Sequence, residues 1–239
     1  MKSHLLYIPY DCAALAYAQN TLQSLGYSFI DHPSPDITHV LLPVPSKLSA
    51  LGKQLAMLPK NVTIIGGRLN DPALSGYTTI DLLQSEEYLA KNAAITAHCA
   101  VKVTLPLLTS TLQDCSVLVI GWGRIGKCLA QLLRSMGARV TVAARKPSDR
   151  AILQALSFPT TAIPIATEES FRLIFNTVPA PISLRSRAME RCIKIELASS
   201  DGLSGDDIIL ARGLPGKEAP ESSGQLIAHS IHQILNSKE

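Results

Sequence analysis

Short apolar runs alternate with amphipathic stretches along most of the chain. In the first third, such runs predict buried strands at Leu5–Ile8, Val40–Leu42 and Val62–Ile65, because short apolar segments between turn residues are typical of strands covered on both faces. A helical repeat of apolar residues over Ala13–Leu25 predicts a helix, and Gly26 after it tolerates the left-handed conformation of a helix end. Strands that alternate with helices predict an α/β fold with a parallel sheet.

The second half repeats this alternation more regularly and predicts a Rossmann-type, doubly wound parallel sheet. The predicted elements are strand Ser116–Ile120, helix Arg124–Met136, strand Arg139–Ala143, helix Ser148–Leu156, strand Arg172–Asn176, strand Cys192–Leu197 and strand Ile208–Ala211. A Gly/Pro-rich loop over Gly213–Pro220 then leads into a last helix, Ser222–Asn236. Ile227, Ile231 and Ile234 give that helix one apolar face, which must pack against other elements.

One long segment, Leu82–Leu108, has a helical period and is free of glycine and proline until Pro106. A helix of that length would span nearly 40 Å at about 1.5 Å per residue, which is enough to connect two domains. We therefore expect a small N-terminal α/β domain over residues 1–84 and a second domain, Rossmann-type, over residues 85–221. The C-terminal helix, 222–239, is expected to return to the first domain.

Composition narrows the class of protein. Hydrophobic residues make up 46% and charged residues 17% of the 239, so there is enough apolar surface to offset the entropy of the chain. The net charge of the chain, +3, is small, and the basic residues are scattered along the sequence, which argues against nucleic-acid binding. No apolar run is long enough for a membrane span. Pro9 and Asp11 interrupt the signal-like start, so we expect a cytoplasmic protein without membrane association.

Metal binding is not expected. The five cysteines are far apart and form no C-x-x-C pair, so reduced and mostly buried thiols are predicted. His229 and His232 are three residues apart on the last helix, but no third ligand of suitable spacing lies near them.

The segment that carries chemistry has the spacing G-x-G-x-x-G. It follows an apolar strand and opens an apolar-periodic helix, the context in which this spacing binds a dinucleotide. The first glycine would permit the tight turn, the second the close approach of a pyrophosphate, and the third the packing of helix on strand. The helix start supplies free N–H groups and a favourable dipole. The predicted cofactor-binding residues here are Gly121, Trp122, Gly123, Arg124, Ile125 and Gly126.

The end of the next strand indicates which dinucleotide binds. NAD-binding versions place a carboxylate there for the ribose hydroxyls, whereas this chain has Arg145 and Lys146. Since a guanidinium pairs with a 2′-phosphate and a carboxylate would repel it, we predict NADP(H) rather than NAD(H). Asn176, Thr177 and Val178 follow a later strand and are predicted to line the opposite wall of the cofactor site.

These pieces together resemble the dipicolinate synthase family, in particular its NADP-binding component, the A-type chain. The resemblance rests on the run Val117–Lys146, the block Ile174–Ala180, the stretch Ile195–Ser200, the loop Gly213–Pro220 and, on the long helix, Asn92–Ala97. It covers roughly residues 62–236. Membership would imply an NADP-linked Rossmann protein that acts with a flavoprotein-like B subunit in endospore formation. The implied reaction makes dipicolinate from a dihydrodipicolinate-level intermediate of the lysine pathway.

Such a dicarboxylate substrate needs cationic or N–H partners. Arg68, Ser199 and Ser200, and the start of the last helix at Ser222 and Ser223, are the predicted substrate-binding residues. His98 is a candidate general base, because its unperturbed pKa is near neutrality. A homo-oligomer is expected.

Two other functions stay open at this stage. One is a D-2-hydroxyacid dehydrogenase, which shares the layout of two α/β domains and a long connecting helix. The other is a cofactor-binding partner subunit without catalysis of its own, favoured by the short first domain and by the absence of a clear acid–base set.

Overall fold

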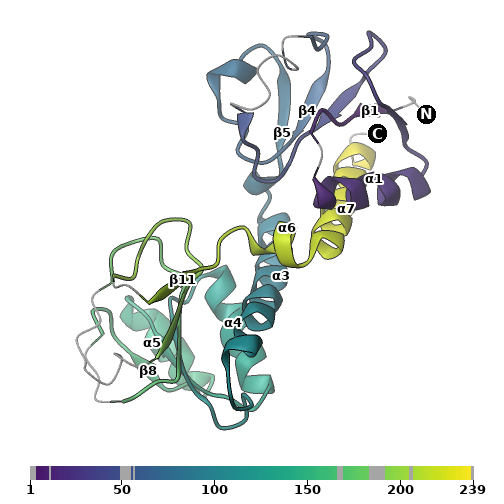
Figure 1. Ribbon diagram of the computed structural model, residues 1–239. Helices are drawn as coiled ribbons and strands as arrows, with labels where there is room; N and C mark the ends of the chain where they lie inside the picture. The colour runs from purple at the N-terminus through teal and green to yellow at the C-terminus, as the bar shows by residue number, and fades with distance from the viewer. Residues whose placement is uncertain are drawn as a thin grey trace. The chain divides into compact units, whose positions relative to one another are not determined.

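The computed structural model describes residues 4–10, 12–48, 55, 57–165, 169–182, 192–204 and 207–237 (Figure 1). The chain forms two compact units. Unit 1 combines the N-terminal residues up to Asn92 with the C-terminal part from Pro215, and unit 2 comprises Ala93–Leu214. Helix α3, Glu86–Thr104, runs through the boundary between them.

Unit 1 is built on a five-stranded parallel sheet with the order β2-β1-β3-β4-β5. The three predicted strands are confirmed with small shifts at their ends. The two further strands were missed because they are short and largely exposed or half-buried, so they carry no apolar run. The bounds are β1 Leu5–Tyr7, β2 Ser28–Ile30, β3 His39–Leu41, β4 Thr63–Gly66 and β5 Thr78–Asp81.

Two helices of unit 1 lie side by side although they are far apart in sequence (Figure 1). They are α1, Ala13–Ser24, and α7, Pro220–Asn236. Their crossing is close: a Cβ atom added to Gly224 would overlap the carbonyl oxygen of Ala14 and lie 2.6 Å from the Cβ of Tyr17. Helix α7 starts at Pro220, two residues earlier than predicted, because proline fits the first helical turn, where no N–H acceptor is available.

The predicted helix Leu82–Leu108 is wrong in its length. Regular helix occupies only Glu86–Thr104, or roughly 28 Å at 1.5 Å per residue. Before it lies a 3₁₀ turn, η3, Leu82–Gln84, whose start is held because Asp81 accepts a bond from the Leu83 N–H at 2.9 Å. After it lies a second, η4, Leu105–Leu107, which contains Pro106.

The segment Gly213–Pro220 also differs from the prediction. Instead of a loop throughout, it contains a short helix, α6, Leu214–Glu218. Its Pro215 stands in the first turn, where the missing N–H costs nothing. Another 3₁₀ turn, η2, Pro72–Leu74, is held by the Asp71 carboxylate.

Unit 2 confirms the Rossmann-type prediction. Its six strands are all parallel in the order β11-β10-β9-β6-β7-β8, which is the 3-2-1-4-5-6 order of dinucleotide-binding sheets. The central strands are buried along nearly their whole length. The bounds are β6 Ser116–Ile120, α4 Arg124–Ser135, β7 Arg139–Ala143, α5 Pro147–Ala155, β8 Thr160–Thr161, β9 Leu173–Asn176, β10 Ile193–Glu196 and β11 Ile208–Leu210.

Candidate functional site

The glycine-rich turn joins the end of β6 to the start of α4. Gly121 has a φ of 106°, in the left-handed region that side chains disfavour, and its N–H donates to the Ala143 carbonyl at 2.8 Å. A Cβ atom at Gly126 would overlap the carbonyl oxygen of Gly121. The turn therefore needs glycine at both positions for the chain itself to fold.

Gly123 differs from these two glycines. Its φ of −80° suits any residue, and a Cβ atom added there would meet nothing within 4 Å apart from its chain neighbours. Gly123 is also the N-cap of α4, whose first N–H groups have no intrahelical acceptor. The open space beside Gly123 and these N–H groups could together hold an anionic group such as a pyrophosphate.

Trp122 stands between Gly121 and Gly123 in the turn. Its half-buried ring packs edge-on against Phe158, with 5.9 Å between the ring centroids. The Lys127 ammonium lies 5.8 Å from the centre of the indole. Arg124 and Ile125 form the first turn of α4, the former exposed and the latter half-buried.

The β7–α5 turn carries the predicted cations. Arg145 and Lys146 are both exposed, and the first acidic residue after β7 is Asp149, in the first turn of α5. Sequence reasoning missed a third cation, Arg150, whose Nη1 donates to the carbonyl oxygens of Ala144 and Arg145, both at 2.8 Å. Arg150 thus holds the backbone of the turn that presents the other two.

The loop after β9 contacts the glycine-rich turn directly. The Thr177 hydroxyl donates to the Ile120 carbonyl at 2.9 Å, and a Cβ atom at Gly121 would overlap this hydroxyl and lie 2.8 Å from Val178. Asn176 is fully buried; its amide nitrogen donates to the Val178 carbonyl and its amide oxygen accepts from the Val178 N–H, each at 3.0 Å. Asn176 therefore shapes this wall through the loop, not through an exposed side chain.

Ser199 and Ser200 are exposed on the loop that follows β10. Because the sheet is parallel, this loop lies at the same carboxyl edge as the glycine-rich turn and the β9 loop. Ligands of such sheets bind outside the carboxyl ends of the strands, where the strand order reverses, here between β6 and β9.

In unit 1, Arg68 is exposed and takes a φ of 61°, a strained conformation for a residue with a side chain. The backbone on either side is fixed. Gly67 donates its N–H to the Pro43 carbonyl at 3.2 Å, and Leu69 donates to the Asp81 carboxylate at 2.9 Å. No other described residue forms a hydrogen bond or ion pair with the Arg68 side chain, so its guanidinium is available to a ligand.

The same carboxyl edge of the unit 1 sheet has a hollow of about 800 Å³ beside the ends of β1 and β2. It is lined by a mixture of rings, amides and acidic or basic groups, among them Tyr10, Gln19 and Asp31. Arg68, which follows β4, is not among the residues that line this hollow.

The remaining predicted residues of the substrate and catalytic site, His98, Ser222 and Ser223, lie on two helices. His98 is exposed on α3, and none of the described residues is bonded to its ring. Ser222 is exposed in the first turn of α7, whereas Ser223 is buried and donates its N–H to Ala219 at 3.0 Å. The Ser223 N–H is therefore not available to a substrate carboxylate, and Glu221 beside it adds a negative charge.

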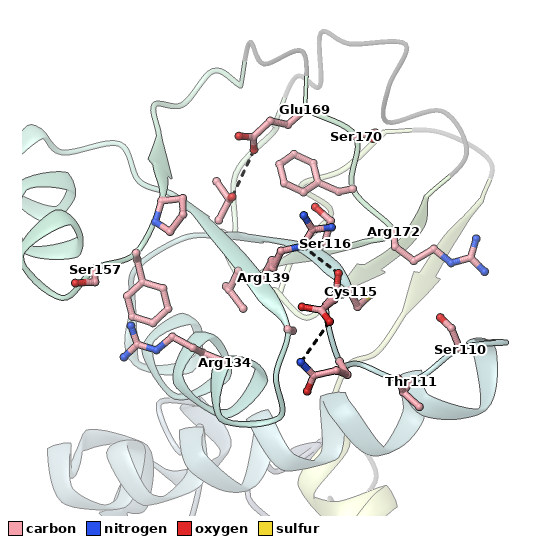
Figure 2. Close-up of a pocket in the computed structure, with 18 residues that line it drawn as sticks. Ser110, Thr111, Cys115, Ser116, Arg134, Arg139, Ser157, Glu169, Ser170 and Arg172 are labelled. Atoms are coloured by element: carbon pink, nitrogen blue, oxygen red, sulfur yellow. Dashed lines mark hydrogen bonds between the residues drawn. The ribbon is translucent and has the colours of Figure 1, made fainter.

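A second hollow, of about 1200 Å³, lies at the edge of the unit 2 sheet where the strands begin, opposite the edge that carries the glycine-rich turn (Figure 2). Its lining includes Ser116, Arg139 and Arg172, at the amino ends of β6, β7 and β9. This hollow is therefore separated from the glycine-rich turn by the length of the strands.

The described residues also bear on metal ligands, membrane-spanning helices and the state of the cysteines. Within the part of the chain that the structure describes, no group of three His, Cys, Asp or Glu side chains could hold a metal ion. In the same residues, no helix is both long and apolar enough to cross a membrane. All five cysteines are free thiols, of which Cys99, Cys115 and Cys192 are buried.

Comparison with known proteins gave matches in sequence and in structure. No protein-family model matches the chain. The dipicolinate synthase A chain of Bacillus subtilis strain 168 is 25% identical over 173 residues, which cover 65% of this chain and 57% of that protein. The sequence match thus spans little more than half the length of this relative.

Solved structures extend the likeness to the whole chain. The dipicolinate synthase A chain from Bacillus halodurans superposes with a TM-score of 0.82 at 19% identity, covering 98% of this chain and 97% of the other. D-lactate dehydrogenase from Escherichia coli superposes with a TM-score of 0.58 at 16% identity, covering 98% and 96%. The resemblance predicted from the motifs is confirmed, and the fold is one that dehydrogenases share.

Proposed function

Because the chain is a relative of the dipicolinate synthase A chains, we propose that it is a nicotinamide-dependent oxidoreductase that binds NADP(H) and forms dipicolinate. The observation that carries the proposal is the glycine-rich turn: two glycines are required by the fold, while Gly123 leaves space beside the start of α4. Nothing in the packing of the described residues requires glycine at position 123, whereas a pyrophosphate would.

The preference for NADP(H) rests on charge. Arg145 and Lys146 are exposed at the end of β7, and Arg150 fixes the backbone that carries them. Exposed guanidinium and ammonium groups can pair with a 2′-phosphate, whereas no carboxylate immediately follows β7 to accept hydrogen bonds from a free ribose hydroxyl.

A bound nicotinamide would supply the hydride acceptor. In the proposed reaction, a dihydropyridine dicarboxylate loses a hydride from a ring carbon and a proton from the ring, and becomes the aromatic dicarboxylate. Aromatisation supplies much of the driving force, so the protein has mainly to orient the substrate and exclude competing reactions. Arg68 of unit 1 is proposed to pair with a carboxylate of the substrate. Ser199 and Ser200, exposed on the loop after β10 of unit 2, are proposed as hydroxyl donors to a ligand at that edge of the sheet.

Titration with the reduced nucleotides tests the cofactor assignment. We expect NADPH to bind at least about tenfold more tightly than NADH, a difference of about 1.4 kcal/mol. Replacing both Arg145 and Lys146 with glutamine should remove most of that preference. The matched control is Arg172→Gln, which removes an exposed cation from the opposite sheet edge and should leave both affinities unchanged. Tighter binding of NADH by the wild-type chain would refute the NADP assignment.

A second function, a cofactor-binding subunit without catalysis of its own, is favoured by His98. An effective general base is usually oriented by a hydrogen bond, and none of the described residues provides one for this ring. The two functions differ in an activity assay with a B-type partner subunit: NADPH binding without dipicolinate formation, in the presence of the partner, would support the second.

A further inference from the structure

Glu196 is a buried carboxylate at the carboxyl end of β10. It is 1% exposed, and among the described residues no other Asp, Glu, Lys, Arg or His side chain is buried. Taking an ionised group out of water is costly unless hydrogen bonds compensate its charge. A buried charge at the ligand-binding edge of a Rossmann sheet therefore needs a physical reason.

The compensation comes entirely from N–H groups. Oε1 accepts from the Asn176 amide at 2.9 Å and from the Ala198 N–H at 3.1 Å. Oε2 accepts from the same amide at 3.0 Å and from the N–H groups of Gly202 and Leu203 at 3.0 Å and 2.9 Å. No lysine or arginine in the described ranges is bonded to Glu196.

These bonds tie two loops to one side chain. Three of them fix the backbone of the β10 loop on both sides of Ser199 and Ser200. The bonds to Asn176 fix its side-chain amide. This amide in turn holds Val178, because it accepts from the Val178 N–H and donates to the Val178 carbonyl. Gly202 completes the contact, because a Cβ atom there would overlap the Asn176 amide nitrogen.

The β9 loop in turn forms a wall of the glycine-rich turn, through Thr177 and Val178 against Gly121. A continuous series of contacts thus leads from Glu196 through Asn176 to the turn where the pyrophosphate is proposed to bind. We infer that Glu196 is the positioning residue that fixes two parts of the nucleotide site: the β9 loop, which forms one wall, and the β10 loop, which carries Ser199 and Ser200. This inference rests on the proposed nucleotide-binding function.

Only a carboxylate satisfies this arrangement. Glutamine has nearly the same shape, but its amide nitrogen would replace either Oε1 or Oε2. It would then leave one or two backbone N–H groups without an acceptor, that of Ala198 or those of Gly202 and Leu203, in addition to its own unpaired hydrogens. Glu196→Gln is therefore expected to release both loops, although it changes few atoms.

The test combines amide hydrogen exchange with nucleotide binding. In the free protein, Glu196→Gln should raise exchange at least about tenfold in peptides covering 176–178 and 198–203, since opening equilibria follow local stability. Asn176→Ala should raise it mainly over 176–178, because the backbone bonds to Glu196 remain. The matched control, Glu169→Gln, replaces an exposed carboxylate of the same unit and should leave both peptides unchanged.

Binding then separates positioning from simple stability. For Glu196→Gln, the Kd for NADPH should rise about tenfold or more, whereas the Kd for adenosine 2′,5′-bisphosphate should change less than about twofold, because the β7–α5 cations are untouched. Phe171→Leu, a buried change at the amino edge, controls for lost stability and should shift neither Kd.

The outcomes are distinct. Unchanged exchange in Glu196→Gln overturns the inference, and so does raised exchange with an unchanged NADPH Kd or with an equal loss of affinity for both ligands. If the wild-type chain binds neither NADPH nor NADH, the proposed function fails; the exchange result then still decides whether Glu196 fixes the two loops.

Discussion

Replacing Gly123 and Gly126 with alanine, one at a time, separates what the glycine-rich turn does for the fold from what it does for a ligand. The two positions lie three residues apart at the start of α4, Gly123 as its N-cap and Gly126 within its first turn. A methyl group on Gly126 would overlap the Gly121 carbonyl oxygen and lie 3.3 Å from the Thr177 hydroxyl. A methyl group on Gly123 would meet no heavy atom beyond its chain neighbours within 4 Å.

The expected stabilities follow from these contacts. Gly126→Ala overpacks a backbone that cannot move freely and should cost about 1–3 kcal/mol. For a chain of this size that lowers the thermal midpoint by roughly 2–12 °C. In Gly123→Ala, the loss of a good N-cap, about 0.5 kcal/mol, is offset by a stiffer unfolded chain. Its midpoint should therefore stay within about 2 °C of the wild type.

Nucleotide binding should reverse this order of effects. If a pyrophosphate lies against the backbone at Gly123, the added methyl group occupies its space, and the Kd for NADPH should rise at least about tenfold in a protein of normal stability. Thermal unfolding and fluorescence titration of the same preparations measure both quantities. A Gly123→Ala protein that binds NADPH as tightly as the wild type would refute the placement of the phosphates.

Three further predictions concern other parts of the chain. Arg68→Gly should stabilise unit 1 by up to about 1 kcal/mol, because glycine accepts a φ of 61° without strain. The same variant should bind a pyridine dicarboxylate more weakly than the wild type, and equal affinity of the two proteins would exclude Arg68 from the substrate site. Gly224→Val should lower the free energy of unfolding by about 1–3 kcal/mol by forcing α1 and α7 apart, and an unchanged urea midpoint would contradict their close crossing. Burial raises the pKa of the Cys115 and Cys192 thiols, so at pH 8 both should be alkylated more slowly than the half-buried Cys128. The alkylation rates of Cys115 and Cys192 should still rise above pH 9. Peptide mass spectrometry measures these rates, and faster alkylation of Cys115 and Cys192 than of Cys128 would contradict the prediction.

The Rossmann unit and the glycine-rich turn could be predicted because their signals are local in sequence. The strand before Gly121, the turn itself and the helix after it occupy one short segment, and hydrophobic period and glycine spacing report directly on such segments. The shorter α3 could not be predicted from its period alone. Its apolar repeat continues beyond both ends, and the local bonds of Asp81 and the proline at 106 decide where regular helix starts and stops.

Arg150 and Glu196 escaped prediction for a different reason. Each acts on backbone groups that only the folded chain brings within reach, and in the sequence Glu196 resembles any polar residue at the end of an apolar strand. A carboxylate flanked by Ile195 and Leu197 could have been noticed as a charge inside a buried strand. The identity of its N–H donors, however, depends on the pairing of β9 with β10.

The two sides of the proposed nucleotide site are held by different kinds of restraint, and this has a consequence for substitution. At the glycine-rich turn, backbone presses on backbone at Gly126, so any side chain is costly regardless of its chemistry. At the β9 wall, the restraint is a set of hydrogen bonds to Glu196, which tolerates a change of volume better than a change of charge. Glu196→Asp should therefore retain more NADPH affinity than the isosteric Glu196→Gln, the reverse of what packing alone would dictate; a ranking by side-chain shape would mean that volume, and not the negative charge, positions Thr177 and Val178.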